Sequence, residues 1–352
     1  MDVKRLDDDT MLQILGCLDT DEDIARAGAV CRSWHRLVVD GRLWRRLCMI
    51  RFPELEVFRE VAEQSSGVDC TTVELSKSRS VEEDILRREH KVFCDFYYSL
   101  TRTSSTRSSY IWNALHASST DNPNEDVIQT LYPHPKRLSS GSPSYWSSTG
   151  QKLETVPEFL TYRMVTPLCV VEEIKLRPFE AFFQYGSPIY SPKFVRFYFG
   201  YQACRAPGGH SWSNPHPDGN YVWKYVSPMY PVEQADSLQT FRLPRPVVCI
   251  GGIFQVELVG RVQKQSTDQL YYICICHVSA QGSSLQRYDF EIKDPKSFVL
   301  KSLSKPIEEE KEEEEVEEFF RDEEDEEFFR RLRPELIVWG RPVFEDDDLG
   351  EY

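Results

Sequence analysis

The sequence lacks long apolar runs. Its 352 residues contain no window of eighteen consecutive apolar residues, so a membrane span is not expected. The N-terminal segment from Met1 to Asp9 is charged and is followed by no apolar stretch, which is not the pattern of a secretory signal peptide. We therefore expect the chain in the cytoplasm, the nucleus or both, and no clear basic localisation cluster separates these two compartments.

The common catalytic motifs are also absent. The sequence contains no Gly-x-Ser-x-Gly, P-loop, Gly-x-Gly-x-x-Gly or His-Glu-x-x-His pattern. His210, His216 and Asp218 do not have the spacing of a standard metal site. Nothing in the sequence points to a general base for Cys31 or Cys204 as a nucleophile. We therefore predict a protein with no catalytic residues, no metal and no cofactor.

Negative charge is abundant but unevenly distributed. The net charge is −15, and residues 308–327 contribute −13 of it, so the other 332 residues are close to neutral. This balance argues against nucleic-acid binding, which needs a basic surface. We expect residues 301–352 to form an acidic, largely disordered tail, because blocks of like charge stay solvated. Phe319 and Phe320 interrupt the run, so docking of this segment on a basic partner is the alternative.

The ten cysteines are scattered, which in a reducing compartment indicates free thiols. Cys274 and Cys276 are two residues apart and would face the same side of a strand. Because no second pair stands at zinc-ligand spacing, we interpret them as small apolar core residues.

Residues 1–50 have the apolar periodicity of three or four short helices. Asp8 or Asp9 can cap the first helix, and Thr20 with Asp23 has the spacing of a capping box for the second. Fifty residues with two tryptophans and many leucines cannot bury all of their apolar surface by themselves. Surplus apolar surface on such a small helical bundle is typical of a partner interface.

Residues 1–50 resemble an F-box. The pattern consists of a leucine-rich first helix, then Asp23 to Ala27, then Val30-Cys31-Arg32-Ser33-Trp34, then Leu43-Trp44. The resemblance implies binding to the Skp-type adaptor of a cullin-RING ubiquitin ligase. The positions that match the family motif, some of them adaptor contacts and some bundle core, are Leu6, Leu12, Leu15, Val30, Cys31, Trp34, Leu43 and Trp44. Many F-boxes have Pro after the first Leu, whereas Asp7 stands here, which would weaken the first adaptor contact.

Residues 51–107 are predicted to form a helical linker. Val81, Ile85, Val92 and Phe96 recur at helical spacing, and a helix of this length would act as a stiff spacer.

Residues 108–300 contain short β-type runs separated by turn-rich segments, and no βαβ alternation. Residues 159–164, 169–177, 194–199 and 238–243 have strand patterns, and residues 253–262 and 270–278 look like two long neighbouring strands. We predict an antiparallel β-sandwich, so the whole chain is a multidomain α + β protein.

The β-rich region resembles the galactose-binding-like (discoidin-type) jelly roll. The resemblance rests on Ala117 to Pro123, Val127 to Leu131, Tyr145 to Gly150 and Pro157 to Tyr162. An F-box joined to such a domain is similar to a group of plant F-box proteins.

Discoidin-type domains bind ligands with loops at one end of the sandwich, which draws attention to the loops at residues 182–190 and 208–219. Four residues, Tyr185, His210, Trp212 and His216, are candidates for substrate binding, with packing over the barrel end as an equal alternative. For Phe182, Phe183 and Trp146 we favour packing.

The leading hypothesis is a non-catalytic substrate receptor of an SCF-type ubiquitin ligase. The F-box would bind the Skp-type adaptor and the β-sandwich would bind a target protein, possibly a glycosylated one. The alternative is a lectin-like or protein-binding module with a degenerate F-box that acts outside a ligase.

Overall fold

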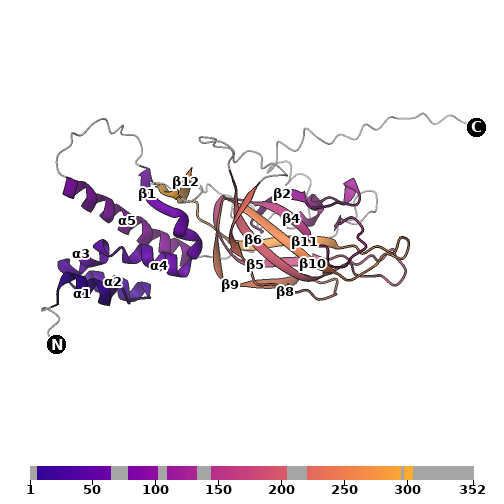
Figure 1. The fold of residues 1–352 in the computed structure, drawn as a ribbon, viewed down its shortest axis with the longest axis horizontal. Helices are drawn as coiled ribbons and strands as arrows, with labels where there is room; N and C mark the ends of the chain where they lie inside the picture. Colours follow the sequence, from indigo (N-terminus) through magenta and orange to yellow (C-terminus); the bar gives the residue numbers. More distant parts are fainter. Residues whose placement is uncertain are drawn as a thin grey trace, which may run out of the picture. The chain divides into compact units, whose positions relative to one another are not determined.

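The computed structural model describes residues 6–64, 78–101, 109–132, 144–203, 220–294 and 297–303. The chain begins with four short helices, which Figure 1 shows packed together. They are α1 (Asp8–Leu15), α2 (Asp21–Val30), α3 (Arg32–Asp40) and α4 (Leu43–Arg51). This helical region at residues 1–50 was expected from the periodicity.

Side-chain caps fix where the first two helices begin. The Asp7 carboxylate accepts a hydrogen bond of 2.7 Å from the Thr10 backbone N–H, so Asp7, and not Asp8 or Asp9, caps α1. Thr20 accepts a hydrogen bond of 3.2 Å from the Asp23 N–H, which confirms the predicted cap of α2. The aspartate that replaces the usual proline of the F-box pattern therefore starts the first helix.

The segment predicted as a helical linker differs from that expectation. A short 3-10 helix, η2 (Pro53–Val57), leads into strand β1 (Phe58–Gln64), and α5 (Ser78–Thr101) follows. β1 pairs in parallel with β13 (Ser297–Leu303), which in turn pairs with β12 (Tyr288–Asp294). The sequence pattern missed β1 because its partner lies more than 230 residues further along the chain.

Two antiparallel sheets form a β-sandwich, as predicted (Figure 1). One sheet contains β2 (Ile111–Ala117), β4 (Glu158–Met164), β10 (Ile253–Arg261), β6 (Pro192–Gln202), β7 (Tyr221–Val226) and β8 (Tyr230–Pro231). The other contains β3 (Trp146–Ser147), β11 (Cys274–Ser284), β5 (Leu168–Pro178) and β9 (Gln239–Ile250). Two 3-10 helices, η3 (Pro123–Glu125) and η4 (Val127–Leu131), lie between β2 and β3.

The prediction that residues 253–262 and 270–278 form neighbouring strands is wrong. β10 pairs with β4 and β6, whereas β11 pairs with β3 and β5 in the opposite sheet. The connection between them therefore crosses from one sheet to the other at the end of the sandwich. Period-two alternation shows that a segment is a strand, but it does not identify its partner.

Apolar side chains from the two sheets fill the sandwich, with Trp146, Leu160, Tyr162, Phe197 and Phe254 fully buried. The predicted apolar role of Cys274 and Cys276 is confirmed, since both are buried beside Tyr145, Phe179 and Tyr272.

A second apolar cluster joins the helices to the sandwich. It extends from Trp44 and Phe93 through Phe58 and Phe298 to Tyr201 of β6. The F-box helices therefore complete their core with residues of the β-rich region.

Gly282 lies where β11 bulges against β5, and it tests how tightly the sandwich is packed. A Cβ at this position would collide with the Val170 carbonyl and lie 3.0 Å from the Val171 Cα. Because backbone atoms cannot move aside cheaply, we predict that Gly282→Ala lowers the free energy of unfolding by about 2–3 kcal/mol. Gly28→Ala in α2 is the control, since its nearest neighbour would be 3.7 Å away and the change should be neutral or slightly stabilising. Chemical denaturation measures both, and equal stability of the two variants would contradict the prediction.

Candidate functional site

The structure separates the eight matched F-box residues into core and surface. Leu15, Leu43 and Trp44 are buried, and Leu12 and Trp34 pack partly against the same core. Leu6, Val30 and Cys31 are exposed, with 60% of Val30 accessible to solvent. The exposed residues come from the start of α1 and the junction of α2 and α3, so these are the side chains available to a partner.

Ile14 belongs with this exposed group, although it is not among the predicted site residues. Met11 and Leu15 turn inward on α1, while Ile14 is 49% exposed. Its signal in the sequence was an apolar residue outside the stripe that one helix face can bury. We use the term adaptor surface for Leu6, Ile14, Val30 and Cys31.

The turn between β5 and β6 presents aromatic side chains to solvent. Phe182 and Phe183 are 55% and 57% exposed, so the prediction that they plug the sandwich is wrong, whereas Trp146 is fully buried as expected. Tyr185 is fully exposed at the tip of the turn. The turn reverses at Gly186 and Ser187, which both adopt left-handed backbone conformations (φ 81° and 45°).

A buried aromatic layer supports the exposed rings. Phe179 stacks on Tyr145 with a centroid distance of 3.8 Å, and its ring lies 6.5 Å from Phe182 and 6.1 Å from Phe183. The Tyr190 hydroxyl donates a 2.6 Å hydrogen bond to Gln184 within the same turn. The exposed aromatics therefore stand on a packed base.

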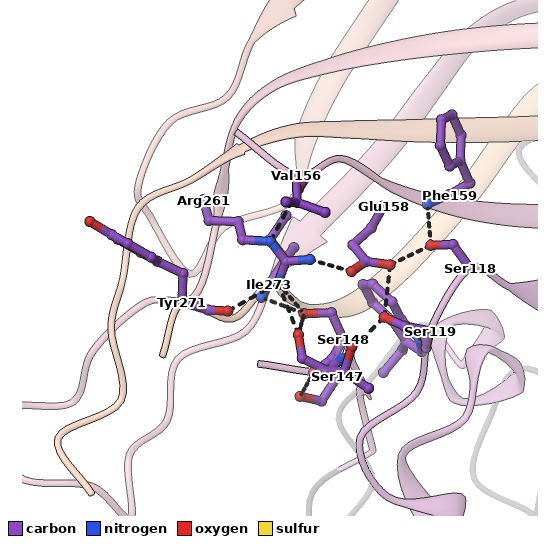
Figure 2. Close-up of polar contacts among 12 residues, drawn as sticks. Ser118, Ser119, Ser147, Ser148, Val156, Glu158, Phe159, Arg261, Tyr271 and Ile273 are labelled. Atoms are coloured by element: carbon purple, nitrogen blue, oxygen red, sulfur yellow. Dashed lines mark hydrogen bonds and ion pairs between the residues drawn. The ribbon is translucent and has the colours of Figure 1, made fainter. Parts of the chain in front are cut away.

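A buried ion pair fixes the neighbouring segments at this end of the sandwich. Figure 2 shows the Arg261 guanidinium paired with the Glu158 carboxylate, and both side chains are almost completely buried. Arg261 also donates to the Ser148 hydroxyl at 2.9 Å and to the Tyr271 carbonyl at 3.0 Å. Burial lowers the pKa of Arg261, and the Glu158 charge opposes that shift.

Glu158 extends the network to the segment after β2. Its carboxylate accepts hydrogen bonds from the hydroxyls of Ser118 and Ser119 (Figure 2). Ser119 in turn accepts from the Thr149 N–H at 3.1 Å, and its carbonyl accepts from the Trp146 indole at 3.0 Å. One ion pair thus ties together the segments that begin at residues 118, 146 and 271.

Three carboxylates lie on or next to these tied segments: Asp121, Glu125 and Asp268. Glu125 accepts a 2.7 Å hydrogen bond from the Tyr145 hydroxyl, and Asp268 accepts one of 2.6 Å from the Tyr272 hydroxyl. Burial, with a contribution from Asp268, raises the pKa of the Asp121 carboxyl, and burial also raises the pKa of Glu125. The hydrogen bond from Tyr272 lowers the pKa of Asp268.

These carboxylates and the exposed rings form one surface. Among the residues that the structure describes, no Lys or Arg makes an ion pair with the three carboxylates. The aromatic–carboxylate face is our name for Asp121, Glu125, Asp268, Phe182, Phe183 and Tyr185. It stands at the end of the sandwich where β5 ends and β6 begins.

The second candidate loop for substrate binding, residues 208–219, is flanked by β6 and β7. His210, Trp212 and His216 lie outside the described residues. The flanking residues Gln202 and Tyr221 are paired at the end of β6 that is opposite to Pro192 and the Tyr185 turn. Eleven strand residues span roughly 30 Å. The described residues that flank the two loops therefore lie at opposite ends of β6.

The described residues include cysteine thiols and other side chains of the types that hold metal ions. They contain no group of three or more His, Cys, Asp or Glu side chains placed to hold a metal ion. Burial raises the pKa of Cys94 to about 11 and that of Cys276 to about 12, so these thiols stay protonated at neutral pH. In the same part of the chain, no helix has the length and apolar character needed to cross a membrane.

Comparison with known proteins identifies the family of the helical region at the start of the chain. A family model described as F-box-like matches residues 6–50. An F-box protein of Arabidopsis thaliana is 41% identical over 316 residues, which cover 86% of this chain and 82% of that protein. The chain therefore belongs to the F-box proteins.

Solved structures similar to this chain include carbohydrate-binding modules. A family 32 module from a Clostridium perfringens family 31 glycoside hydrolase is 10% identical, with a TM-score of 0.33 over 51% of this chain and 95% of the module. The family 32 module of Streptococcus pneumoniae EndoD is 12% identical, with a TM-score of 0.32 over 49% of this chain and 98% of that module.

The Arg261–Glu158 pair allows a direct test of what holds the loops. We predict that Glu158→Gln lowers the free energy of unfolding by about 3–5 kcal/mol, because Arg261 keeps its buried charge without a partner. The double variant Glu158→Gln with Arg261→Met should lose less than the sum of the two single variants. Lys193→Met is the control, since it breaks an exposed pair with Glu154 and should cost less than about 1 kcal/mol. Additive losses in urea denaturation would show that the pair does not act as one structural element.

Proposed function

We propose that this protein is the substrate receptor of an SCF-type cullin-RING ubiquitin ligase that works in the cytoplasm or the nucleus. Its F-box helices bind the Skp-type adaptor, and its β-sandwich binds the target protein. Other subunits transfer ubiquitin, and this chain positions the target. The observation that carries the proposal is the F-box match at residues 6–50, together with apolar side chains on those helices that the core leaves in solvent.

The adaptor surface has the chemistry of a protein interface. Val30 and Ile14 expose branched apolar side chains on short helices. Burial of these side chains against a partner would remove them from water, which favours binding. The same helices also carry exposed ion pairs, since Asp8 pairs with Arg36 at 2.8 Å and Glu22 pairs with Arg26 at 2.8 Å. An apolar centre with a polar rim is the usual anatomy of a specific interface.

The opposite end of the sandwich is the best place for a target. The strand ends nearest the F-box contribute Leu168, Tyr201 and Ile250 to the core shared with the helices, so they are covered. The aromatic–carboxylate face lies at the other ends of these strands and remains open. Adaptor and target are thereby held apart on one scaffold, which is the geometry that a receptor subunit needs.

The double variant Val30→Glu with Ile14→Glu tests the adaptor surface. Two charges buried against an apolar partner should weaken binding to a purified Skp-type adaptor by at least about tenfold, measured by calorimetry. Because both side chains point to solvent, the thermal unfolding midpoint should not change.

Leu153→Glu with Leu238→Glu is the matched control, since both leucines are exposed on the sandwich. The control should bind the adaptor normally. If the native chain binds no Skp-type adaptor, the ligase role is wrong, and the chain then acts as a binding protein outside a ligase.

A further inference from the structure

The aromatic–carboxylate face combines two features that together narrow the choice of ligand. Phe182 and Phe183 offer ring faces and edges to solvent at an interplanar angle of 81°, and Tyr185 adds a third exposed ring. Exposed aromatic rings attract cations through their quadrupole and also stack on flat apolar surfaces. This feature alone would suit a sugar, a peptide or another aromatic group.

The carboxylates add a charge that the described residues do not neutralise. Asp121, Glu125 and Asp268 carry up to three negative charges within one cluster, and burial raises the pKa of the first two because their ionised forms are poorly hydrated. Lys264 is close to Asp268 in the sequence. Its ammonium lies over the Tyr271 ring, 4.7 Å from the ring centroid, and makes no ion pair with Asp268 among the described residues. The charge of the cluster is therefore available to a ligand.

Aromatic rings and carboxylates are connected through a short chain of contacts. Glu125 binds Tyr145, Tyr145 stacks on Phe179, and Phe179 contacts the exposed Phe183. A lysine or arginine side chain carries an apolar stem and a cationic end, so it can cover a ring and reach a carboxylate at the same time. Sugar hydroxyls can donate hydrogen bonds to carboxylates, but a neutral sugar brings no positive charge to balance up to three negative ones, which favours a cation over a sugar.

We infer that the aromatic–carboxylate face binds a basic segment of the target protein, with lysine or arginine side chains placed over Phe182 and Phe183 and their charges directed to Asp121, Glu125 and Asp268. This inference rests on the proposed receptor function and adds the chemical class of the target. Among the described residues of the sandwich, no other turn exposes three aromatic side chains together.

The test uses the full chain bound to its adaptor and a defined probe. The probe is a twelve-residue Gly/Ser peptide with three lysines, one fluorophore and one photoreactive benzophenone, compared with the same peptide carrying three glutamines. Fluorescence anisotropy should show that the lysine peptide binds more tightly and that added salt weakens its binding.

Two variants separate the contributions of charge and aromatic surface. Asp121→Asn, Glu125→Gln and Asp268→Asn in one chain keep the side-chain shapes and should weaken lysine-peptide binding by about tenfold or more. Phe182→Ser with Phe183→Ser should weaken it by a similar factor, through loss of cation–π and stem contacts. The control neutralises three exposed carboxylates on other elements, Asp19→Asn, Glu56→Gln and Glu82→Gln, and should bind the peptide like the native chain.

Photocrosslinking distinguishes the face from the acidic segment 308–327, which would also attract lysines. Crosslinks should map to the turn 179–191 and disappear in the charge variant. Crosslinks confined to residues 306–352, equal binding of the glutamine peptide, or full binding by the charge variant would overturn the inference. The inference would also be overturned if a neutral oligosaccharide bound through Phe182 and Phe183 and the lysine peptide did not bind there.

Adaptor binding is measured on the same samples, so that the two proposals fail separately. If the native chain binds the adaptor normally but does not bind the peptide, the receptor function stands and only the inference of a basic target is wrong. Absence of adaptor binding in the native chain removes the receptor function, whatever the peptide does.

Discussion

The pairing of β1 with β13 is the constraint on which the rest of the arrangement depends. It places Phe58, which follows the F-box, against Phe290 and Phe298 near the end of the β-rich region, with ring centroids 6.1 and 6.2 Å apart. Phe298 also meets Tyr201 of the sandwich at 5.1 Å. Each of these buried rings contributes about 1.5–3 kcal/mol, so separating the helices from the sandwich would expose a large apolar area.

Polar contacts reinforce this shared core. Arg245, at a bend in β9, pairs with Glu54 of η2, whose side chain is 1% exposed. Arg45 of α4 donates to the Phe58 carbonyl at 3.0 Å and to Glu89 of α5 at 3.1 Å. A buried carboxylate such as Glu54 is costly without its partner, so the pair favours one relative position of F-box and sandwich. The helix α5 is accordingly part of a core and does not behave as a separate spacer.

This rigidity gives a physical reason for the length of the sandwich strands. β5 begins and β6 ends in the shared core, and both strands carry the aromatic–carboxylate face at their other ends. A sheet bends little over such a distance, so a target bound as proposed would keep a defined position relative to the adaptor surface. The Arg261–Glu158 pair performs the same task locally, because it ties three loop segments to β4 and β10.

Much of this arrangement followed from local sequence patterns, and the remainder depended on distant partners. The F-box helices were predictable because spaced Leu and Trp residues with Thr20 and Asp23 define helix faces and starts. The strands were predictable from alternation, but the sheet to which β11 belongs was not, since only its partners in β3 and β5 determine that. No local signal identified β1 as a strand.

Side-chain exposure was the least predictable property of the candidate sites. Phe182 and Phe183 look like core residues in any window of sequence, yet more than half of each side chain is exposed. Likewise, the F-box pattern includes Leu43 and Val30 alike, although one is buried and the other is 60% exposed. Exposure depends on what the rest of the chain covers, which one sequence does not reveal.

The chemistry of the open face fits a receptor that must also release its target. A single cation–π contact or partly exposed ion pair contributes about 0.5–1 kcal/mol, so three rings and three carboxylates reach moderate affinity only when several are used together. Removing either the rings or the carboxylates should therefore lower the affinity steeply. A ligand that engages only the rings or only the carboxylates should bind weakly. Because electrostatic attraction acts mainly on the rate of association, the proposed basic segment would bind such a face quickly and would still dissociate from it.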